Sequence, residues 1–262
     1  MNKDEALKNS FLEFVEIVRR LRKECPWDRE QTHESLRRCL LEESYEVLES
    51  IDNNNLHELK KELGDVLLQV VFHASIGEDE KTFTLEEVIE HEKKKLIERH
   101  PHIYGDVKVS GSEEVKINWE KLKRKEGRES VLDGVPNELP ALFKAYRIQE
   151  KAAKVGFDWK DPKPVYDKIL EEIGELKQNM EKNLEHNKIE EEFGDVLFSI
   201  VNYARFLKIN PEDALRKTIK KFSVRFRKIE AHAKSIGKKP EDMTLEEMDA
   251  VWNSVKGESD EK

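Results

Sequence analysis

The sequence has few cysteines and no long apolar run, and each of these absences excludes a class of protein. Its two cysteines, Cys25 and Cys39, lie too far apart for a C-x-x-C redox or zinc motif, so we expect reduced, packed thiols. No apolar run approaches the roughly 18 to 20 residues that span a bilayer, and the polar start does not resemble a signal peptide. We therefore expect a cytoplasmic protein with no membrane partner.

The sequence also lacks an excess of positive charge, since 56 Asp and Glu outnumber 47 Lys and Arg. No overall basic field attracts a nucleic acid, so we expect none as a partner, although clustered basic residues leave a local anion site open. The chain is instead rich in charged residues of both signs, which make up 39% of the sequence, while hydrophobic residues make up 37%. This balance is typical of small helical domains with charged outer faces.

Apolar residues recur at helical spacing through most of the chain, which predicts an all-α fold. Cys25-Pro26 ends the first helix, Thr32 is the expected N-cap of the second, and residues 52–55 form a turn before the third. The third helix is expected to bury Leu59, Leu63, Val66, Leu67 and Val70. The other expected helices span residues 4–24, 85–100, 139–155, 164–182, 186–207 and 211–235, with a short one around Trp119, a last one from about 244, and a loop at 107–115.

The second half of the chain repeats landmarks of the first half in the same order. Such an internal echo predicts a tandem duplication of helical-bundle domains. We place the domains at residues 1–128 and 139–262. Residues 129–138 are the expected linker, because charge, Gly and Pro occur there without periodicity.

Pairs of acids at i, i+3 spacing form the main functional signal, because such pairs project from one side of a helix. Two pairs on adjacent helices of a hairpin flank one seam, where they repel one another unless a divalent cation neutralises them. Carboxylates are suitable ligands for Mg²⁺, so one interpretation of the acid pairs is a metal site. The alternative is that the acids simply lie on solvent-exposed faces of charged helices. The repetition of the pairs in both halves favours the metal site. The pairs are Glu43/Glu46, Glu62/Asp65, Glu172/Glu175 and Glu192/Asp195.

Gly64 and Gly194 each precede the last acid of their set. Glycine inside a helix costs up to about 1 kcal/mol relative to alanine, so its presence needs a reason. Close helix packing and a functional role are both open, and either one predicts a crowded helix crossing beside the acids.

Basic and aromatic residues follow the acids at matching positions in both halves. Lys and Arg side chains there could contact phosphates, and a Trp ring could stack on a base. The alternative is a solvated helix face with a Trp in the core. The candidates are Lys95, Arg99, Trp119 and Lys123 in the first half, and Lys221, Arg225, Trp252 and Lys256 in the second.

The four acid pairs, together with the segments CPWDREQTHESL, KELGDVLLQVVFHA, HPHIYG and KAAKVGFDW, resemble the MazG nucleoside triphosphate pyrophosphohydrolases in their two-domain bacterial form. The match covers nearly the whole chain. The resemblance implies an all-α fold of MazG-type helical bundles and a homodimer. It also implies Mg²⁺-dependent hydrolysis of NTPs and dNTPs to the monophosphate and pyrophosphate, with broad base tolerance, for nucleotide-pool cleaning or stress-linked control.

The resemblance also implies roles for residues of the second half. Glu172, Glu175, Glu192 and Asp195 would hold Mg²⁺ and activate or orient the attacking water. Trp252 would hold the nucleoside. The phosphates would be held by Lys188, Lys221, Arg225 and Lys256, with Glu171 and Glu191 also in the substrate site.

The two halves differ beside the acids. Aligning the acid pairs sets Lys188 against Glu58 and Glu191 against Lys61, so the second half offers a cation where the first has an acid. We therefore predict catalysis in the second half and leave the first as active, dimerising or regulatory. The alternative function is a non-catalytic nucleotide-sensing or assembly module, which the retained acids disfavour.

Overall fold

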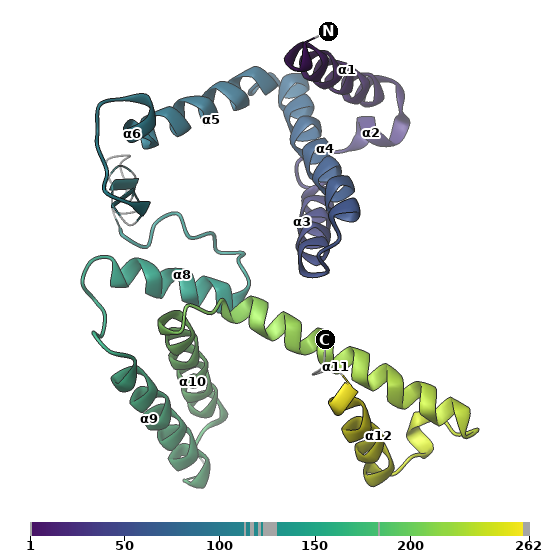
Figure 1. Cartoon of the computed structure of the whole chain (residues 1–262), viewed down its shortest axis with the longest axis vertical. Coiled ribbons are helices and arrows are strands. Elements are labelled where there is room, and N and C mark those ends of the chain that lie inside the picture. Colours follow the sequence, from purple (N-terminus) through teal and green to yellow (C-terminus); the bar gives the residue numbers. More distant parts are fainter. Residues whose placement is uncertain are drawn as a thin grey trace. The chain divides into compact units, whose positions relative to one another are not determined.

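A computed structural model describes residues 2–112, 114–115, 118–119, 122, 130–182 and 184–258. Every regular element in these ranges is a helix, which confirms the predicted all-α fold (Figure 1). The chain divides into two units, Met1–Leu122 and Lys123–Lys262. The boundaries drawn from the sequence stay a prediction. Over the described ranges, no helix combines the length and the apolar character that a membrane crossing needs.

The first unit is built around an antiparallel pair of helices, α3 and α4 (Figure 1). The expected turn joins them, and Asn55 caps α4 by accepting a hydrogen bond from the Glu58 N–H at 3.2 Å. α1 packs on α4, and Val18, Val71, Phe72 and Ile76 are buried in the core there. The helices of this unit are α1 (Lys3–Glu24), α2 (Pro26–Glu30), α3 (Arg37–Asp52), α4 (Leu56–Glu80), α5 (Leu85–Arg99) and α6 (Pro101–Tyr104).

The start of α3 and the end of the 107–115 loop differ from the sequence prediction. α3 begins after Leu36 without a side-chain cap, because Thr32 instead closes a separate turn by accepting from the Ser35 N–H at 3.1 Å. The short helix α2, with a proline in its first turn, had not been predicted. The loop is shorter than expected, since the Glu114 carboxylate accepts from the Ser110 N–H and hydroxyl and residues 114–115 are helical.

The predicted buried face of α4 is only partly buried. Leu63, Leu67 and Val70 are 52%, 40% and 42% exposed, so their predicted burial is wrong for the single chain. The apolar stripe exists, but α1 and α3 pack on other sides of α4 and bury its C-terminal half instead. The stripe is therefore open within the described part of the first unit.

The second unit repeats the antiparallel pair as α9 and α10, with α8 packed against α10 (Figure 1). α11 contacts α8 and α10 near one end and carries α12 along its other end, where Ile229, Ala233 and Met243 form a small core. The helices of this unit are α8 (Ala141–Ala153), α9 (Pro162–Glu181), α10 (His186–Phe206), α11 (Pro211–Ser235), the 3₁₀ turn η1 (Pro240–Asp242) and α12 (Leu245–Glu258).

The two glycines beside the acids do not mark a crowded crossing in the single chain. A Cβ atom added at Gly64 or at Gly194 would meet no other atom within 4 Å. Both glycines lie on exposed faces of their helices. The predicted crowding is therefore wrong within each unit, because no described side chain or neighbouring helix of the same unit approaches these faces.

Candidate metal and nucleotide site

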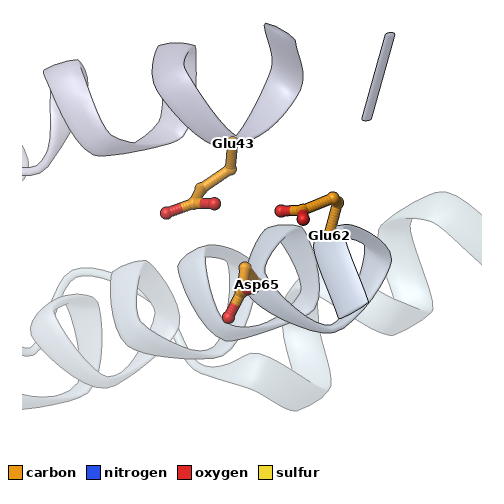
Figure 2. Close-up of side chains that lie close together, drawn as sticks. All are labelled: Glu43, Glu62 and Asp65. Carbon is orange, nitrogen blue, oxygen red and sulfur yellow. The ribbon is translucent and has the colours of Figure 1, made fainter. Parts of the chain in front are cut away.

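Three acids meet between α3 and α4 of the first unit. Glu43 of α3 points toward Glu62 and Asp65 of α4, and one carboxylate oxygen of each lies within 4.8 Å of the others (Figure 2). Desolvation raises the pKa of Glu43, with further increases from the charges of Asp65 and Glu46. Desolvation also raises the pKa of Glu62, followed by its hydrogen bond with Glu46. All four predicted acids therefore lie close enough to interact.

The second unit forms the matching cluster between α9 and α10. Oxygens of Glu172, Glu192 and Asp195 again lie within 4.8 Å of one another. Glu192 is oriented by Asn179, whose Nδ2 donates to its Oε1 at 3.0 Å. Glu175, the fourth predicted acid, lies one turn further along α9 on an exposed face and is not one of the three that meet.

Lys168 distinguishes the second cluster from the first. Its Nζ lies 2.7 Å from Glu171 Oε1 and 2.8 Å from Glu172 Oε1, and these two contacts raise the pKa of Lys168. Aligning Glu43 with Glu172 puts Cys39 of the first unit opposite Lys168. Lys168 and Asn179 were not among the predicted site residues, although the i, i+4 spacing of Lys168 and Glu172 is a detectable signal in the sequence.

Two of the predicted substrate-binding residues, Arg225 of α11 and Trp252 of α12, contact one another. The Arg225 guanidinium lies over the Trp252 ring, 5.5 Å from its centroid, and that ring packs against Phe222 with centroids 5.2 Å apart. Trp252 thus contributes to the small core of the unit. In the described ranges, no ion pair links a carboxylate to Lys188, Lys221, Arg225 or Lys256.

The corresponding residues of the first unit are placed as follows. Lys95 pairs with Glu92 along α5, and Arg99 lies in the last turn of that helix. The Trp119 ring contacts His100, with centroids 5.6 Å apart. Lys123 lies outside the described residues. Lys95 and Trp119 therefore have partners within their own unit.

A cavity of about 590 Å³ lies beside the second cluster. It is enclosed by α8, α9, α10 and two turns, and Glu172 and Asp195 form part of its wall. Most of the wall is apolar. Its other polar groups are an Arg205–Asp158 ion pair and the side chains of Gln149, Asn202, Lys168, Ser130 and Ser199. The size and lining are those of a small-molecule site. Asp158 and Trp159 belong to the segment KAAKVGFDW, whereas no pattern in the sequence pointed to Gln149 or Asn202.

Both clusters fit a hard divalent cation. Each supplies three carboxylates from two helices, and oxygen atoms that approach within 4.8 Å need little movement to share one ion. Mg²⁺ is bound by a few carboxylates while it keeps waters or phosphate oxygens as its other ligands.

Mg²⁺ is expected to raise the melting temperature of the chain by several degrees at neutral pH. The raised pKa values of Glu43 and Glu62 mean that the folded state holds their protons more tightly than the unfolded state. Their contribution to stability therefore falls as pH rises from about 4.5 through the raised values, and a bound cation offsets that loss. Thermal unfolding with and without Mg²⁺ at pH 7.5 and pH 5 tests this.

The rise should shrink at pH 5, because protons compete with the cation for the same oxygens. A Glu43→Gln variant should show a smaller rise than the unchanged chain. NaCl of equal ionic strength serves as the control, and an equal rise with NaCl would contradict metal binding.

Comparison with known proteins relates both clusters to one domain family. Residues 31–104 and 161–229 each match the MazG nucleotide pyrophosphohydrolase domain, so each matched segment contains one cluster. The chain is 48% identical to "Nucleoside triphosphate pyrophosphohydrolase/pyrophosphatase MazG" of Thermotoga maritima, over 94% of this chain and 96% of that protein. It is 40% identical to "Nucleoside triphosphate pyrophosphohydrolase" of Escherichia coli K12, over 95% and 97%. "Uncharacterized protein YabN" of Bacillus subtilis is 46% identical over 98% of this chain and 53% of its own length.

Proposed function

Because the chain belongs to the MazG nucleotide pyrophosphohydrolase family, we propose that its second unit hydrolyses nucleoside triphosphates to the monophosphate and pyrophosphate. The observation that carries the proposal is the cluster of Glu172, Glu192 and Asp195, two of which, Glu172 and Asp195, lie in the wall of a cavity. The proposed substrates include both NTPs and dNTPs with broad base tolerance. Nucleotide-pool cleaning or stress-linked control is the proposed cellular role.

The proposed catalytic acids are Glu172, Glu175, Glu192 and Asp195. Mg²⁺, when bound, would neutralise the polyphosphate and lower the pKa of a water molecule. Glu172, Glu192 and Asp195, whose oxygens lie within 4.8 Å of one another, would hold the cation, and Glu175 extends the acidic surface along α9. The contact of Lys168 with Glu172 and that of Asn179 with Glu192 fix the directions of these two carboxylates.

The proposed phosphate-binding cations are Lys188 of α10 with Lys221, Arg225 and Lys256 of α11 and α12. Arg225 is buried, and its Nε has no hydrogen-bond partner among the described residues. Within one chain, α11 and α12 extend away from the α9–α10 pair (Figure 1). We therefore propose that a second copy of the chain supplies these helices and completes the phosphate site.

We further propose that the chain forms a homodimer through its helix pairs. Each helix of both pairs carries exposed apolar residues at i, i+4, i+7 spacing, which form one stripe along the helix. Two pairs that each leave such stripes open can bury them together as a four-helix bundle. The open space at Gly64 and Gly194 would let a partner helix approach closely. The stripes are Leu41, Tyr45 and Leu48 on α3; Leu63, Leu67 and Val70 on α4; Tyr166, Leu170 and Ile173 on α9; and Phe193, Leu197 and Ile200 on α10.

Light scattering of the purified chain tests the dimer. The unchanged chain should have the mass of two copies, and the double variant Leu67→Glu, Leu197→Glu should have the mass of one. Leu7→Glu is the matched control, because Leu7 is also exposed but lies on α1 outside the stripes. A monomeric mass for the unchanged chain would overturn this part of the proposal.

Pyrophosphate release from each NTP and dNTP in the presence of Mg²⁺ tests the activity. We expect release from all of them and little without a divalent cation. Nucleotide binding with no release from any nucleotide would overturn the enzyme proposal and favour a nucleotide-sensing module instead.

A further inference from the structure

We propose that the apolar cavity of the second unit receives the nucleoside base and that Gln149 and Asn202 contact its hydrogen-bonding edge. This inference rests on the proposed function, because it assigns a site to the part of the substrate that is not phosphate. It places the base in this cavity and not at Trp252, which the family resemblance implied as the nucleoside contact.

The position of the cavity suits a base whose phosphates lie at the acids. Glu172 and Asp195 belong to its wall, so a ligand inside it has its polar end at the carboxylate cluster. Apolar side chains such as Val165 and Phe198 line the interior, where they can contact the faces of a base. Trp159, also in the wall and 44% exposed, offers a ring for stacking.

Gln149 carries a hydrogen-bond acceptor that has no partner in the chain. Its side chain is 7% exposed, and its Nε2 donates to the Phe198 carbonyl at 2.8 Å. A carbonyl oxygen can only accept, so the amide orientation is fixed and Oε1 is the atom left over. Oε1 is buried without a hydrogen-bond partner among the described residues. Buried acceptors are nearly always satisfied, so this one indicates a ligand N–H group.

Asn202 complements Gln149 with a donor. Its Oδ1 accepts from Arg205 Nε at 3.1 Å and from Nη2 at 2.8 Å, and Asp158 holds the same guanidinium through a contact of 2.9 Å. This arrangement fixes Oδ1 toward Arg205 and leaves the NH₂ group of Asn202 for other partners. The wall therefore offers an acceptor and a donor. Each nucleobase presents both kinds of group on its Watson–Crick edge, which suits broad base tolerance.

The first unit fills the matching space with side chains. Aligning Gly64-Asp65 with Gly194-Asp195 sets Phe72 opposite Asn202, and aligning Glu43 with Glu172 sets Leu36 opposite Val165. Phe72 and Leu36 are 5% and 2% exposed and belong to the core cluster, against which Phe11 and Phe14 also pack. Among the described residues, the first unit thus keeps the acids but packs side chains where the second unit has its apolar cavity. The hollow beside its acids is smaller, about 250 Å³, and is lined by polar residues such as Glu46, Glu49 and Glu62. This difference favours base binding in the second unit.

Steady-state hydrolysis by the full-length chain tests the assignment, with inorganic tripolyphosphate as a competitor that has no base. Gln149→Leu should raise KM for NTPs about tenfold, because a donor on the base loses its acceptor. Asn202→Phe, which copies the first unit, should raise KM at least as much. Inhibition by tripolyphosphate should change in neither variant. Gln178→Leu on the exposed face of α9 is the matched control.

Two results separate the possible failures. Unchanged KM values in both variants, with an active unchanged chain, would overturn the cavity assignment alone. So would a raised KM in Trp252→Ala combined with normal values in the cavity variants. An unchanged chain that releases no pyrophosphate would overturn the proposed function, and the base site with it. Thermal unfolding of each variant shows whether it folds, and either folded variant is sufficient for the test.

Discussion

Asp195→Ala is expected to lower the kcat for pyrophosphate release by about a thousandfold, whereas Asp65→Ala is expected to leave most of it. The two acids occupy the same place in the repeated Gly-Asp-Val-Leu segments, and each belongs to a cluster of three carboxylates. Asp195 also lies in the wall of the apolar cavity, whereas Leu36 and Phe72, which match two residues of that wall, are packed in the core of the first unit. Steady-state assays with saturating NTP and Mg²⁺ measure the difference.

The same pair of variants separates loss of activity from loss of fold. Both remove one carboxylate from a repelling cluster, so neither should lower the melting temperature much in the absence of Mg²⁺. Each should lower the Mg²⁺-dependent rise of the unit that it alters. Equal losses of kcat in both variants would contradict catalysis confined to the second unit.

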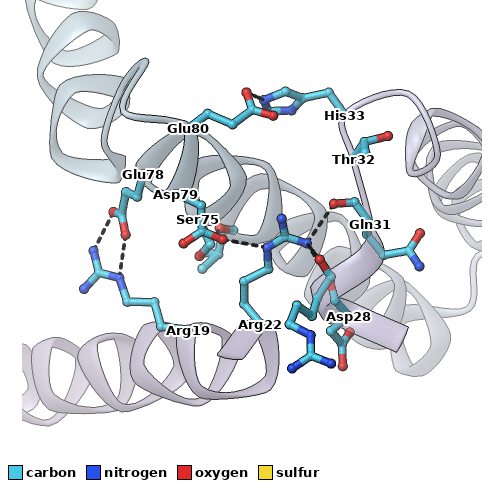
Figure 3. A network of polar contacts seen from close by, with 12 residues as sticks. Arg19, Arg22, Asp28, Gln31, Thr32, His33, Ser75, Glu78, Asp79 and Glu80 are labelled. Carbon is cyan, nitrogen blue, oxygen red and sulfur yellow. Dashed lines mark hydrogen bonds and ion pairs between the residues drawn. The ribbon is translucent and has the colours of Figure 1, made fainter. Parts of the chain in front are cut away.

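Arg22→Leu is expected to destabilise the first unit by about 3 kcal/mol, because it leaves three carbonyl oxygens without their donor. Arg22 Nη1 donates to the carbonyls of Asp28 at 2.6 Å, Arg29 at 3.0 Å and Gln31 at 2.7 Å, and Nε donates to Asp79 Oδ2 at 2.9 Å. Figure 3 shows this guanidinium between α1, the chain after α2 and the end of α4. Urea unfolding followed by circular dichroism measures the change.

Arg20→Leu is the matched control on the same helix. Arg20 pairs only with Glu24, at 3.0 Å on the exposed surface, and exposed pairs of this kind contribute little to stability. Its midpoint in urea should therefore stay close to that of the unchanged chain. A similar shift for both variants would mean that the carbonyl contacts of Arg22 do not stabilise the unit.

The helices and both acid clusters could be predicted from the sequence because short-range spacing determines them. The 3.6-residue period places Glu62 and Asp65 on one side of α4, and the short turn after α3 brings Glu43 across from them. The burial of Leu63 and Leu67 could not be predicted in the same way. Periodicity identifies the apolar face of a helix, but the neighbouring helices decide whether that face is covered.

The cavity could not be predicted from the sequence, because a cavity forms where side chains from different helices leave a space between them, and this depends on tertiary packing. Gln149 comes from α8 and Asn202 from α10, and no local pattern relates two polar residues in helices that otherwise look amphipathic. The contacts of Arg22 were hidden for a similar reason. Its partners are backbone carbonyls, and backbone groups have no signature in the amino-acid sequence.

The first unit packs side chains where the second unit has a cavity, so the two units should differ in stability and in how nucleotide affects it. The side chains that line a cavity make fewer dispersion contacts than close-packed side chains do. Without ligand, the second unit should therefore have a lower free energy of unfolding than the first. Nucleotide bound in that cavity would stabilise the second unit, and the gain in unfolding free energy would grow with the logarithm of one plus the nucleotide concentration divided by Kd. The duplicated chain can then keep one copy rigid whatever the supply of nucleotide, while the folding of the other copy responds to it.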